Sequence, residues 1–193
     1  MEHFATIQGE GRFSGTASYF IRLGGCDVGC HWCDVKESWP SSGYELMTAS
    51  QIANLVSNSK QKIVVITGGE PLMHNLDELT QKLNKANVQC HIETSGAHPF
   101  SGKWDWITFS PKKFKAPLPG CAEIASELKV VIFNKSDFDF AQKHAAEVSE
   151  KCLLYLQPEW GKRETIMPEL VAFVKANPRW RISLQTHKYL NIP

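Results

Sequence analysis

The chain has 193 residues and a net charge of +1, from 21 lysines and arginines against 20 aspartates and glutamates. Its length predicts a single domain over residues 1–193. The near-neutral charge excludes a strongly basic nucleic-acid binder, and no apolar run approaches the roughly 20 residues of a membrane span. No secretory signal is recognisable, and six cysteines are too few for a disulfide scaffold. We therefore expect a cytoplasmic protein without nucleic-acid or membrane partners, whose clustered thiols bind metal or carry out chemistry.

Strand-like and helix-like segments alternate along the chain. In the first half we predict a strand at 19–23, a helix at 49–57 capped by Thr48, a strand at 62–67, a helix at 76–86, and strands at 89–94 and 106–109. In the second half we predict a strand at 128–133, a helix at 137–149, a strand at 152–156, a helix at 167–176 with Pro168 in its first turn, and a strand at 181–185. No helix is expected between residues 95 and 135. The fold class is therefore α/β, with a mostly parallel sheet in a small, irregular, partial (βα) barrel.

Three cysteines lie close together in a loop after the first predicted strand. Cys26, Cys30 and Cys33 have the spacing C-x3-C-x2-C. Thiolates are the usual ligands of iron–sulfur clusters, and three of them leave one iron of a four-iron cluster open to a small molecule. A zinc site with His31 as a fourth ligand is one alternative, and three unligated cysteines are another.

A second motif, Gly68-Gly69-Glu70-Pro71, ends the predicted strand at 62–67. Glycines at the end of a strand let a ligand approach the backbone closely, and Glu70 would place a carboxylate beside a ligand ammonium group. By itself such a segment is more often a simple strand-ending turn.

Together, the cysteine spacing, Trp32 before the third cysteine and the Gly-Gly-Glu-Pro turn resemble the radical S-adenosylmethionine (SAM) enzymes. The resemblance implies a partial barrel of radical SAM type. It also implies a [4Fe-4S] cluster on the three cysteines, whose open iron chelates SAM. Reduction would then cleave SAM to a radical that abstracts hydrogen from the substrate. No protein side chain is expected to be the catalytic group itself.

Nearly the whole chain is similar to one family of these enzymes, the 7-carboxy-7-deazaguanine synthases. The motifs that carry this resemblance are Thr6-Ile7-Gln8-Gly9-Glu10-Gly11, Phe20-Ile21-Arg22-Leu23, the Gly-Gly-Glu-Pro turn, Glu93-Thr94-Ser95-Gly96, Ser110-Pro111-Lys112, Gln157-Pro158 and the segment 185–193. The resemblance implies a carbon–nitrogen lyase that converts 6-carboxy-5,6,7,8-tetrahydropterin to 7-carboxy-7-deazaguanine and ammonia. Hydrogen abstraction at C6 and contraction of the ring would yield a precursor of queuosine and related 7-deazapurines.

The same resemblance implies roles for individual residues. The expected SAM-binding residues are Trp32, Cys33, Asp34, Gly68, Gly69, Glu70, Gly96, Ser110, Pro111, Lys112 and Gln157. The expected substrate-binding residues are Ile7, Gln8, Gly9, Glu10, Arg22, Thr94 and Pro193.

These residue types suit the substrate. Gln8 and Glu10 offer hydrogen-bonding groups to the ring edge of a pterin, and the guanidinium of Arg22 suits its carboxylate. Alternatively, Glu10 and Arg22 are an ordinary surface pair. We expect structural hydrogen bonds from His91, His98 and His187, and packing roles for Trp104, Trp106, Trp160 and Trp180.

One position departs from the family. A threonine whose hydroxyl helps to bind magnesium is replaced by Val35, which has no oxygen for a hard cation. We expect magnesium to bind more weakly through other oxygens and water, or another ion to serve.

Partners and alternatives complete the expectations. Because no second cysteine cluster is present, the electron would come from an external donor of flavodoxin or ferredoxin type, and the family resemblance implies a homodimer. The alternatives are another radical SAM enzyme, such as a glycyl-radical activase, and a non-enzymatic binding module stabilised by zinc or a cluster.

Overall fold

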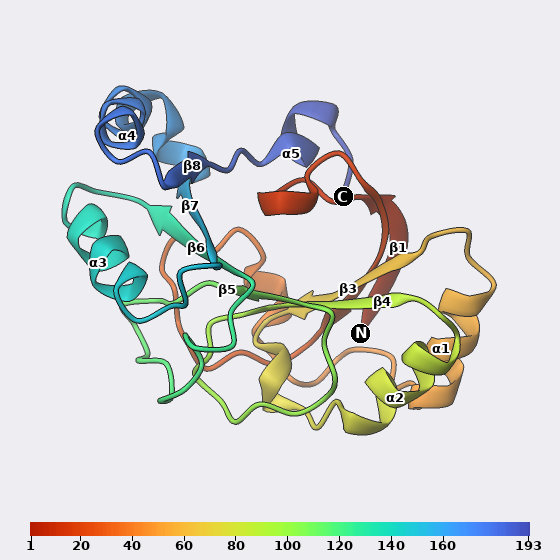
Figure 1. Ribbon diagram of the computed structural model, residues 1–193. Helices are drawn as coiled ribbons and strands as arrows, with labels where there is room; N and C mark the ends of the chain where they lie inside the picture. Colours follow the sequence, from red (N-terminus) through yellow and green to blue (C-terminus); the bar gives the residue numbers. More distant parts are fainter.

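In the computed structural model, which describes residues 1–193, eight strands form one sheet in the order β1-β2-β3-β4-β5-β6-β7-β8 (Figure 1). The strands are β1 (Glu2–Ile7), β2 (Ala17–Leu23), β3 (Ile63–Gly68), β4 (Gln89–Thr94), β5 (Trp106–Phe109), β6 (Glu127–Ile132), β7 (Leu153–Pro158) and β8 (Trp180–Ile182). The helices are α1 (Ala49–Ser57), α2 (Asp77–Lys85), α3 (Ser136–Ala145), α4 (Arg163–Ala176) and α5 (Thr186–Leu190). Only β1 is antiparallel to its neighbour, so the predicted mostly parallel α/β sheet is confirmed.

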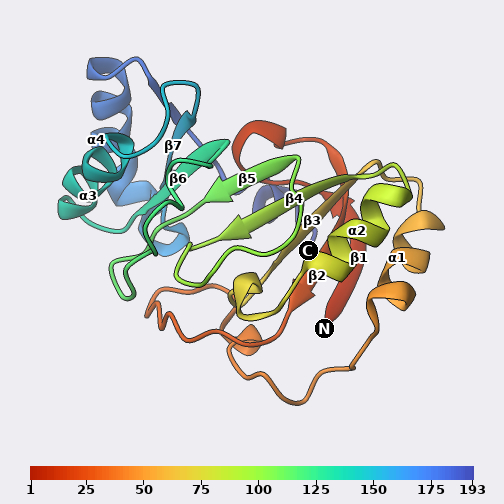
Figure 2. The same cartoon turned by 60° about the horizontal axis from the view of Figure 1, so that its bottom comes forward.

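Two hydrophobic clusters hold the layers together. The first joins β2, β3 and β4 to α1 and α2, and the second joins β5 to β8 with α3 and α4 (Figure 2). In β3, the run Ile63–Gly68 begins with four buried aliphatic residues, as expected for a parallel strand covered on both faces. The helices therefore cover the outside of the sheet. None of the helices has the length and apolar character needed to cross a bilayer.

The sheet does not close into a full barrel, because β1 and β8 do not pair. The C-terminal segment lies at this opening, beside the N-terminal segment (Figure 1). The backbone N–H of Thr186 donates to the Gly9 carbonyl at 2.9 Å, and the hydroxyl of Thr6 donates to the Pro193 carbonyl at 3.1 Å. The gap in the sheet is therefore bridged by the end of the chain, which confirms the predicted partial barrel.

Several predicted elements agree with the structure residue for residue. The strands at 89–94 and 106–109 are β4 and β5, and the helix at 49–57 is α1. Thr48 caps α1 in a capping box with Gln51, in which each side chain accepts from the other residue's backbone N–H. No helix occurs between residues 95 and 135, as expected.

Other boundaries were wrong. The strand at 128–133 lies one residue earlier, the helix at 137–149 ends at Ala145, and the strand at 152–156 continues to Pro158. The strand at 181–185 is only Trp180–Ile182, because the chain leaves the sheet there to bridge the opening. The helix at 167–176 begins earlier, at Arg163, so Pro168 lies inside α4 instead of in its first turn. A proline there removes one helical N–H, and its partner carbonyl is on Glu164, at the exposed start of the helix. Neither β1 nor α5 was predicted from the sequence.

Candidate active site

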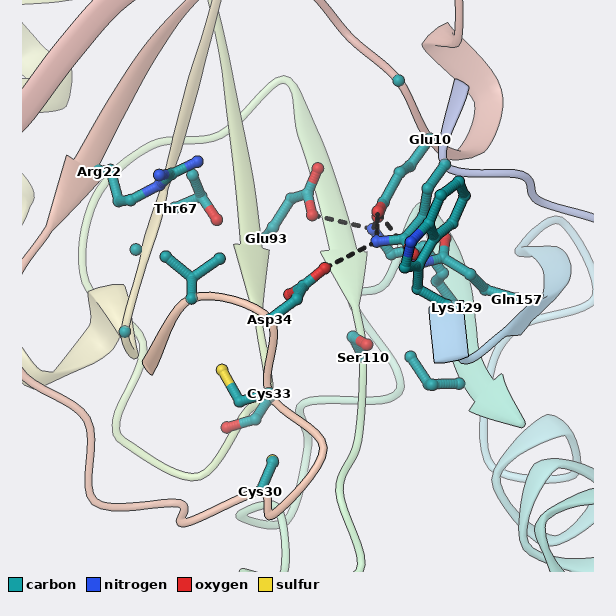
Figure 3. Close-up of a pocket in the computed structure, with 18 of the residues that line it drawn as sticks. Glu10, Arg22, Cys30, Cys33, Asp34, Thr67, Glu93, Ser110, Lys129 and Gln157 are labelled. Carbon is teal, nitrogen blue, oxygen red and sulfur yellow. Dashed lines mark hydrogen bonds and ion pairs between the residues drawn. The ribbon is translucent and has the colours of Figure 1, made fainter. Parts of the chain in front are cut away.

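A cavity of about 250 Å³ lies at the carboxyl ends of the strands, lined by 32 residues. Parallel strands bring the loops after their carboxyl ends to one edge of a sheet, where active sites of such barrels gather. Here the cysteine loop follows β2, the Gly-Gly-Glu-Pro turn follows β3, and Ser110 follows β5. Figure 3 shows Cys30, Cys33 and Ser110 among the residues that line the cavity. The cavity therefore joins motifs that are far apart in the sequence.

The structure brings most of the predicted site residues to this cavity. Those that line it are Cys26, Cys30, Cys33, Trp32, Asp34, Gly68, Gly69, Glu70, Ser110, Lys112, Gln157, Ile7, Gln8, Gly9, Glu10, Arg22, Thr94 and Pro193. Two predicted SAM-binding residues, Gly96 and Pro111, do not line it. Gly96 lies behind the wall at a φ of +73°, where an added Cβ would come within 2.9 Å of the Phe109 ring. Close packing, rather than exposure to the cavity, is what requires glycine there.

The three cysteines lie together at one end of the cavity. Cys30 is buried and packs with Val28 and Ala97, while Cys26 and Cys33 are partly exposed against the same cluster. Burial raises the pKa of Cys30 to about 11, with a smaller opposite effect from the charge of Lys112. No group of three His, Cys, Asp or Glu side chains converges tightly enough to hold a single metal ion. The three thiols thus lie on one wall of the cavity.

Close backbone contacts fix the entrance of the cysteine loop against the turn after β3. Gly69 donates its N–H to the Leu23 carbonyl at 2.9 Å, and Glu70 donates its N–H to the Gly25 carbonyl at 2.8 Å. An added Cβ on Gly68 would lie 2.1 Å from the Leu23 oxygen, and one on Gly69 would lie 2.2 Å from the Gly25 oxygen. Both glycines are therefore required by this backbone approach.

The carboxylate of Glu70 is buried, at 2% exposure, and all its bonds are made within the protein. One oxygen accepts from the Thr94 hydroxyl at 2.5 Å and the Leu72 N–H at 3.1 Å. The other accepts from the Ser95 N–H at 2.8 Å and the Ser95 hydroxyl at 2.5 Å. Glu70 therefore ties the turn after β3 to the turn after β4, besides lining the cavity.

A buried ionic cluster forms the wall of the cavity opposite the three cysteines (Figure 3). The Lys129 ammonium donates to the carboxylates of Glu10 and Glu93, at 2.8 Å in the case of Glu93. Gln8 donates to the second oxygen of Glu93 at 2.9 Å, and Gln157 donates to Glu10 at 3.0 Å. Burial raises the pKa of Glu93, but the charge and hydrogen bond of Lys129 outweigh it and hold that pKa below its ordinary value. The Glu93 carboxylate therefore faces the cavity in its ionised form.

The cysteine loop is also tied to the end of the chain. Asp34 accepts hydrogen bonds from the Lys188 ammonium and from Gln185, the latter at 3.0 Å. Burial raises the pKa of Asp34, but the hydrogen bond and charge of Lys188 outweigh this, and the pKa is lowered. The Lys188 ammonium also lies 5.1 Å from the centre of the Trp160 ring, a cation–π distance. Asp34 is thus a junction between the cysteine loop and the C-terminal segment.

Arg22 lines the cavity, but its guanidinium already has a partner. It donates to Glu2 at 3.0 Å and lies 5.4 Å from the centre of the Phe4 ring. The alternative of a pair between Glu10 and Arg22 is wrong, since Glu10 pairs with Lys129 instead.

Several residues of the cavity wall were given no role at the site from the sequence. Six of them lie in the motifs that carry the family resemblance: Phe20, Glu93, Ser95, Pro158, Gln185 and His187. The others are Val28, Trp39, Thr67, Lys129, Val131, Glu159 and Trp160. Lys129 had a visible signal, since it is a charged residue inside a strand of aliphatic residues. Trp160 was expected only to pack, yet it lines the cavity, whereas Trp180 is indeed in the core. Of the histidines, His98 makes the expected structural hydrogen bond, to Asp27 at 2.9 Å.

Comparisons with known proteins agree with this geometry. Residues 20–109 match the radical SAM superfamily. The 7-carboxy-7-deazaguanine synthase of Flavobacterium psychrophilum is 56% identical over 195 residues, which cover 100% of this chain and 91% of that protein. The enzyme of the same name from Synechocystis is 46% identical over 99% of this chain and 91% of that protein. The crystal structure of QueE from Escherichia coli superimposes with a TM-score of 0.82 at 30% identity, over 95% of this chain and 91% of that chain.

Proposed function

The chain belongs to the 7-carboxy-7-deazaguanine synthase family of the radical SAM superfamily, and we propose on this basis that it converts 6-carboxy-5,6,7,8-tetrahydropterin to 7-carboxy-7-deazaguanine and ammonia. The observation that carries the proposal is the single cavity, with three thiols at one end and the Gln8–Glu10 motif at the other. A cluster-bound cofactor and a pterin would be held side by side there. Substrate and products contain the same atoms, so the reaction needs no net oxidant.

The cysteine end of the cavity suits the implied cofactors. When bound, a [4Fe-4S] cluster and SAM supply the radical that abstracts hydrogen from C6. Cys26, Cys30 and Cys33 would hold the cluster. The residues proposed to bind SAM are those of the expected set that line the cavity: Trp32, Cys33, Asp34, Gly68, Gly69, Glu70, Ser110, Lys112 and Gln157. Gly96 and Pro111 would support the wall from behind.

The opposite end suits the pterin. Ile7, Gly9, Thr94 and Pro193 would enclose the ring, while Gln8 and Glu10 would meet its polar edge. Arg22 would bind the substrate carboxylate only in competition with Glu2, which holds it at 3.0 Å. Because Glu2 is exposed and such pairs are weak, a carboxylate in the cavity can replace it.

A family-type magnesium site does not fit the residues present. Val35 offers no oxygen, and the Asp34 carboxylate is already engaged by Lys188 and Gln185. We propose that magnesium, where it serves, binds weakly through water and substrate oxygens. Titration of product formation with magnesium after chelation tests this, and an affinity as tight as that of threonine-containing relatives would refute it.

Electron supply and assembly are further proposals. With no other cysteine cluster in the chain, an external flavodoxin- or ferredoxin-type protein would deliver the electron. The family resemblance also favours a homodimer in the cytoplasm.

The experiment that tests the function is an anaerobic assay. Iron-reconstituted protein, dithionite, SAM, magnesium and the tetrahydropterin are combined, and products are identified by mass spectrometry. Formation of 7-carboxy-7-deazaguanine is expected. SAM cleavage without that product would point to a different substrate, and a protein that takes up no iron would refute the radical mechanism.

A further inference from the structure

Lys129 is the feature of the cavity that the proposed roles do not use. It lies in the middle of β6, between the buried residues Leu128 and Val130, and is itself only 3% exposed. A buried lysine is costly unless its charge is paired and its hydrogen bonds are made. Its place in the wall of the cavity, rather than at the rim, therefore calls for a specific role.

The contacts of Lys129 are made with two carboxylates at once. Its ammonium donates to Glu10, at the end of the Gln8–Glu10 motif, and to Glu93, at the end of β4, at 2.8 Å. The second oxygen of each carboxylate accepts hydrogen bonds from glutamine side chains. Gln8 donates to Glu93 at 2.9 Å, and Gln157 and Gln185 each donate to Glu10 at 3.0 Å. Two carboxylates are thereby held in fixed positions around one positive charge.

The pairing of Lys129 with two carboxylates has a chemical consequence as well as a structural one. Two carboxylates that share a buried site cannot both stay ionised without a compensating charge, so one of them would take up a proton. A protonated carboxyl group is a hydrogen-bond donor, whereas an ionised one only accepts. The amide-like edge of a pterin presents N–H donors, and these require acceptors in the wall.

We propose that Lys129 is a positioning residue that keeps Glu10 and Glu93 as paired acceptors for the N–H edge of the substrate. Lys129 thereby favours ring systems that carry such an edge over analogues that lack it. The inference rests on the proposed function, because it assigns the polar end of the cavity to the pterin.

Other titratable groups face this cluster. They are Lys112 from the loop after β5, Glu127 on β6, and His187 on α5. Asp34 is linked to Glu10 through Gln185, which donates to both at 3.0 Å. Because the Lys129 charge also acts on Lys112 and Glu127, a pH dependence that appears in Lys129→Met is assigned to the two carboxylates only by a second variant that removes one of them.

The test compares Lys129→Met, whose side chain is one atom shorter and has no charge, with Lys129→Arg. KM and kcat for the tetrahydropterin are measured from pH 6 to pH 9. For Lys129→Met we expect KM to rise roughly 10- to 100-fold, and to rise further as the pH falls, with a smaller change in kcat. Lys129→Arg keeps the charge and should retain most of the substrate affinity. Lys135→Met is the matched control, since the Lys135 side chain is 82% exposed.

A double variant separates positioning from folding. In Lys129→Met with Glu93→Gln only one carboxylate remains, so the pH dependence of KM should disappear and the melting temperature should recover toward that of the unsubstituted chain. A loss of stability with an unchanged KM, or an equal KM rise at every pH, would overturn the role of Lys129. An unsubstituted chain that forms no product would instead overturn the proposed function, so the two failures are distinguishable.

Discussion

Acid sensitivity of the fold should arise in large part from His91, a buried residue of β4. The side chain is 3% exposed and packs on Phe13 and Trp106, with ring centres 4.5 and 6.3 Å away. Burial lowers the pKa of His91 to about 4, from an ordinary value of 6.5. The folded protein therefore keeps this imidazole neutral in a pH range where the unfolded chain protonates it.

The sign and size of the effect follow from this difference. Above pH 6.5 neither state binds the proton, and the stability is fully present. Between pH 6.5 and pH 4 the unfolded state gains a proton that the folded state lacks, so the free energy of unfolding falls as the pH falls. The shift of about 2.5 units corresponds to about 3 kcal/mol in all, of which about 2 kcal/mol is lost by pH 5.

Urea unfolding of the apoprotein at pH 7.5 and pH 5 provides the assay. We expect His91→Phe to remove about 2 kcal/mol of the loss that the unsubstituted chain shows between these two pH values. His31→Gln is the control, because His31 is exposed. His187 has a pKa that burial also lowers, so part of the pH dependence should remain in the His91 variant. Equal losses in the unsubstituted chain and in His91→Phe would refute the reasoning.

Three further substitutions test the site and the core. Gly69→Ala places a Cβ 2.2 Å from the Gly25 oxygen, so it should displace the cysteine loop and lower the iron bound per chain, measured after reconstitution. Glu70→Gln replaces an oxygen that accepts two hydrogen bonds from Ser95 with a donor, and should cost roughly 2 kcal/mol in urea unfolding while lowering product formation. Leu83→Ala, at a fully buried position of α2, should cost about 2–5 kcal/mol without changing the KM for the tetrahydropterin. A stable Glu70→Gln protein or an iron-replete Gly69→Ala protein would contradict the corresponding contact.

Local patterns in the sequence were sufficient for the elements that are stabilised locally. The β-branched run of β3 and the Thr48–Gln51 capping box of α1 are contained within short segments, so both elements can be predicted from neighbouring residues. The missed elements depend on distant partners. β1 is half-exposed and becomes a strand only by pairing with β2, and α5 has five residues and is held by contacts to the N-terminal segment. Neither carries a strong pattern of its own.

The same distinction applies to the cavity. Motifs identified by their residue order, such as the cysteine loop and the Gln8–Glu10 segment, line the cavity. The partners of those motifs could not be predicted, because Glu10 and Lys129 are separated by 119 positions, and Asp34 and Lys188 by 154. No sequence spacing indicates which carboxylate will meet which ammonium. Only the folded sheet, which brings β4, β6 and the C-terminal segment to one edge, determines which carboxylate pairs with which ammonium group.

These long-range pairs also explain how an open sheet can enclose a site. The gap between β1 and β8 would admit water to the polar end of the cavity, but the C-terminal segment spans it. Gln185 donates both to Glu10, in the wall opposite the cysteines, and to Asp34, beside the last cysteine. One amide side chain therefore links the cysteine loop to the opposite wall of the cavity. Because buried, charge-assisted hydrogen bonds are costly to break singly, the two ends of the cavity are expected to order together.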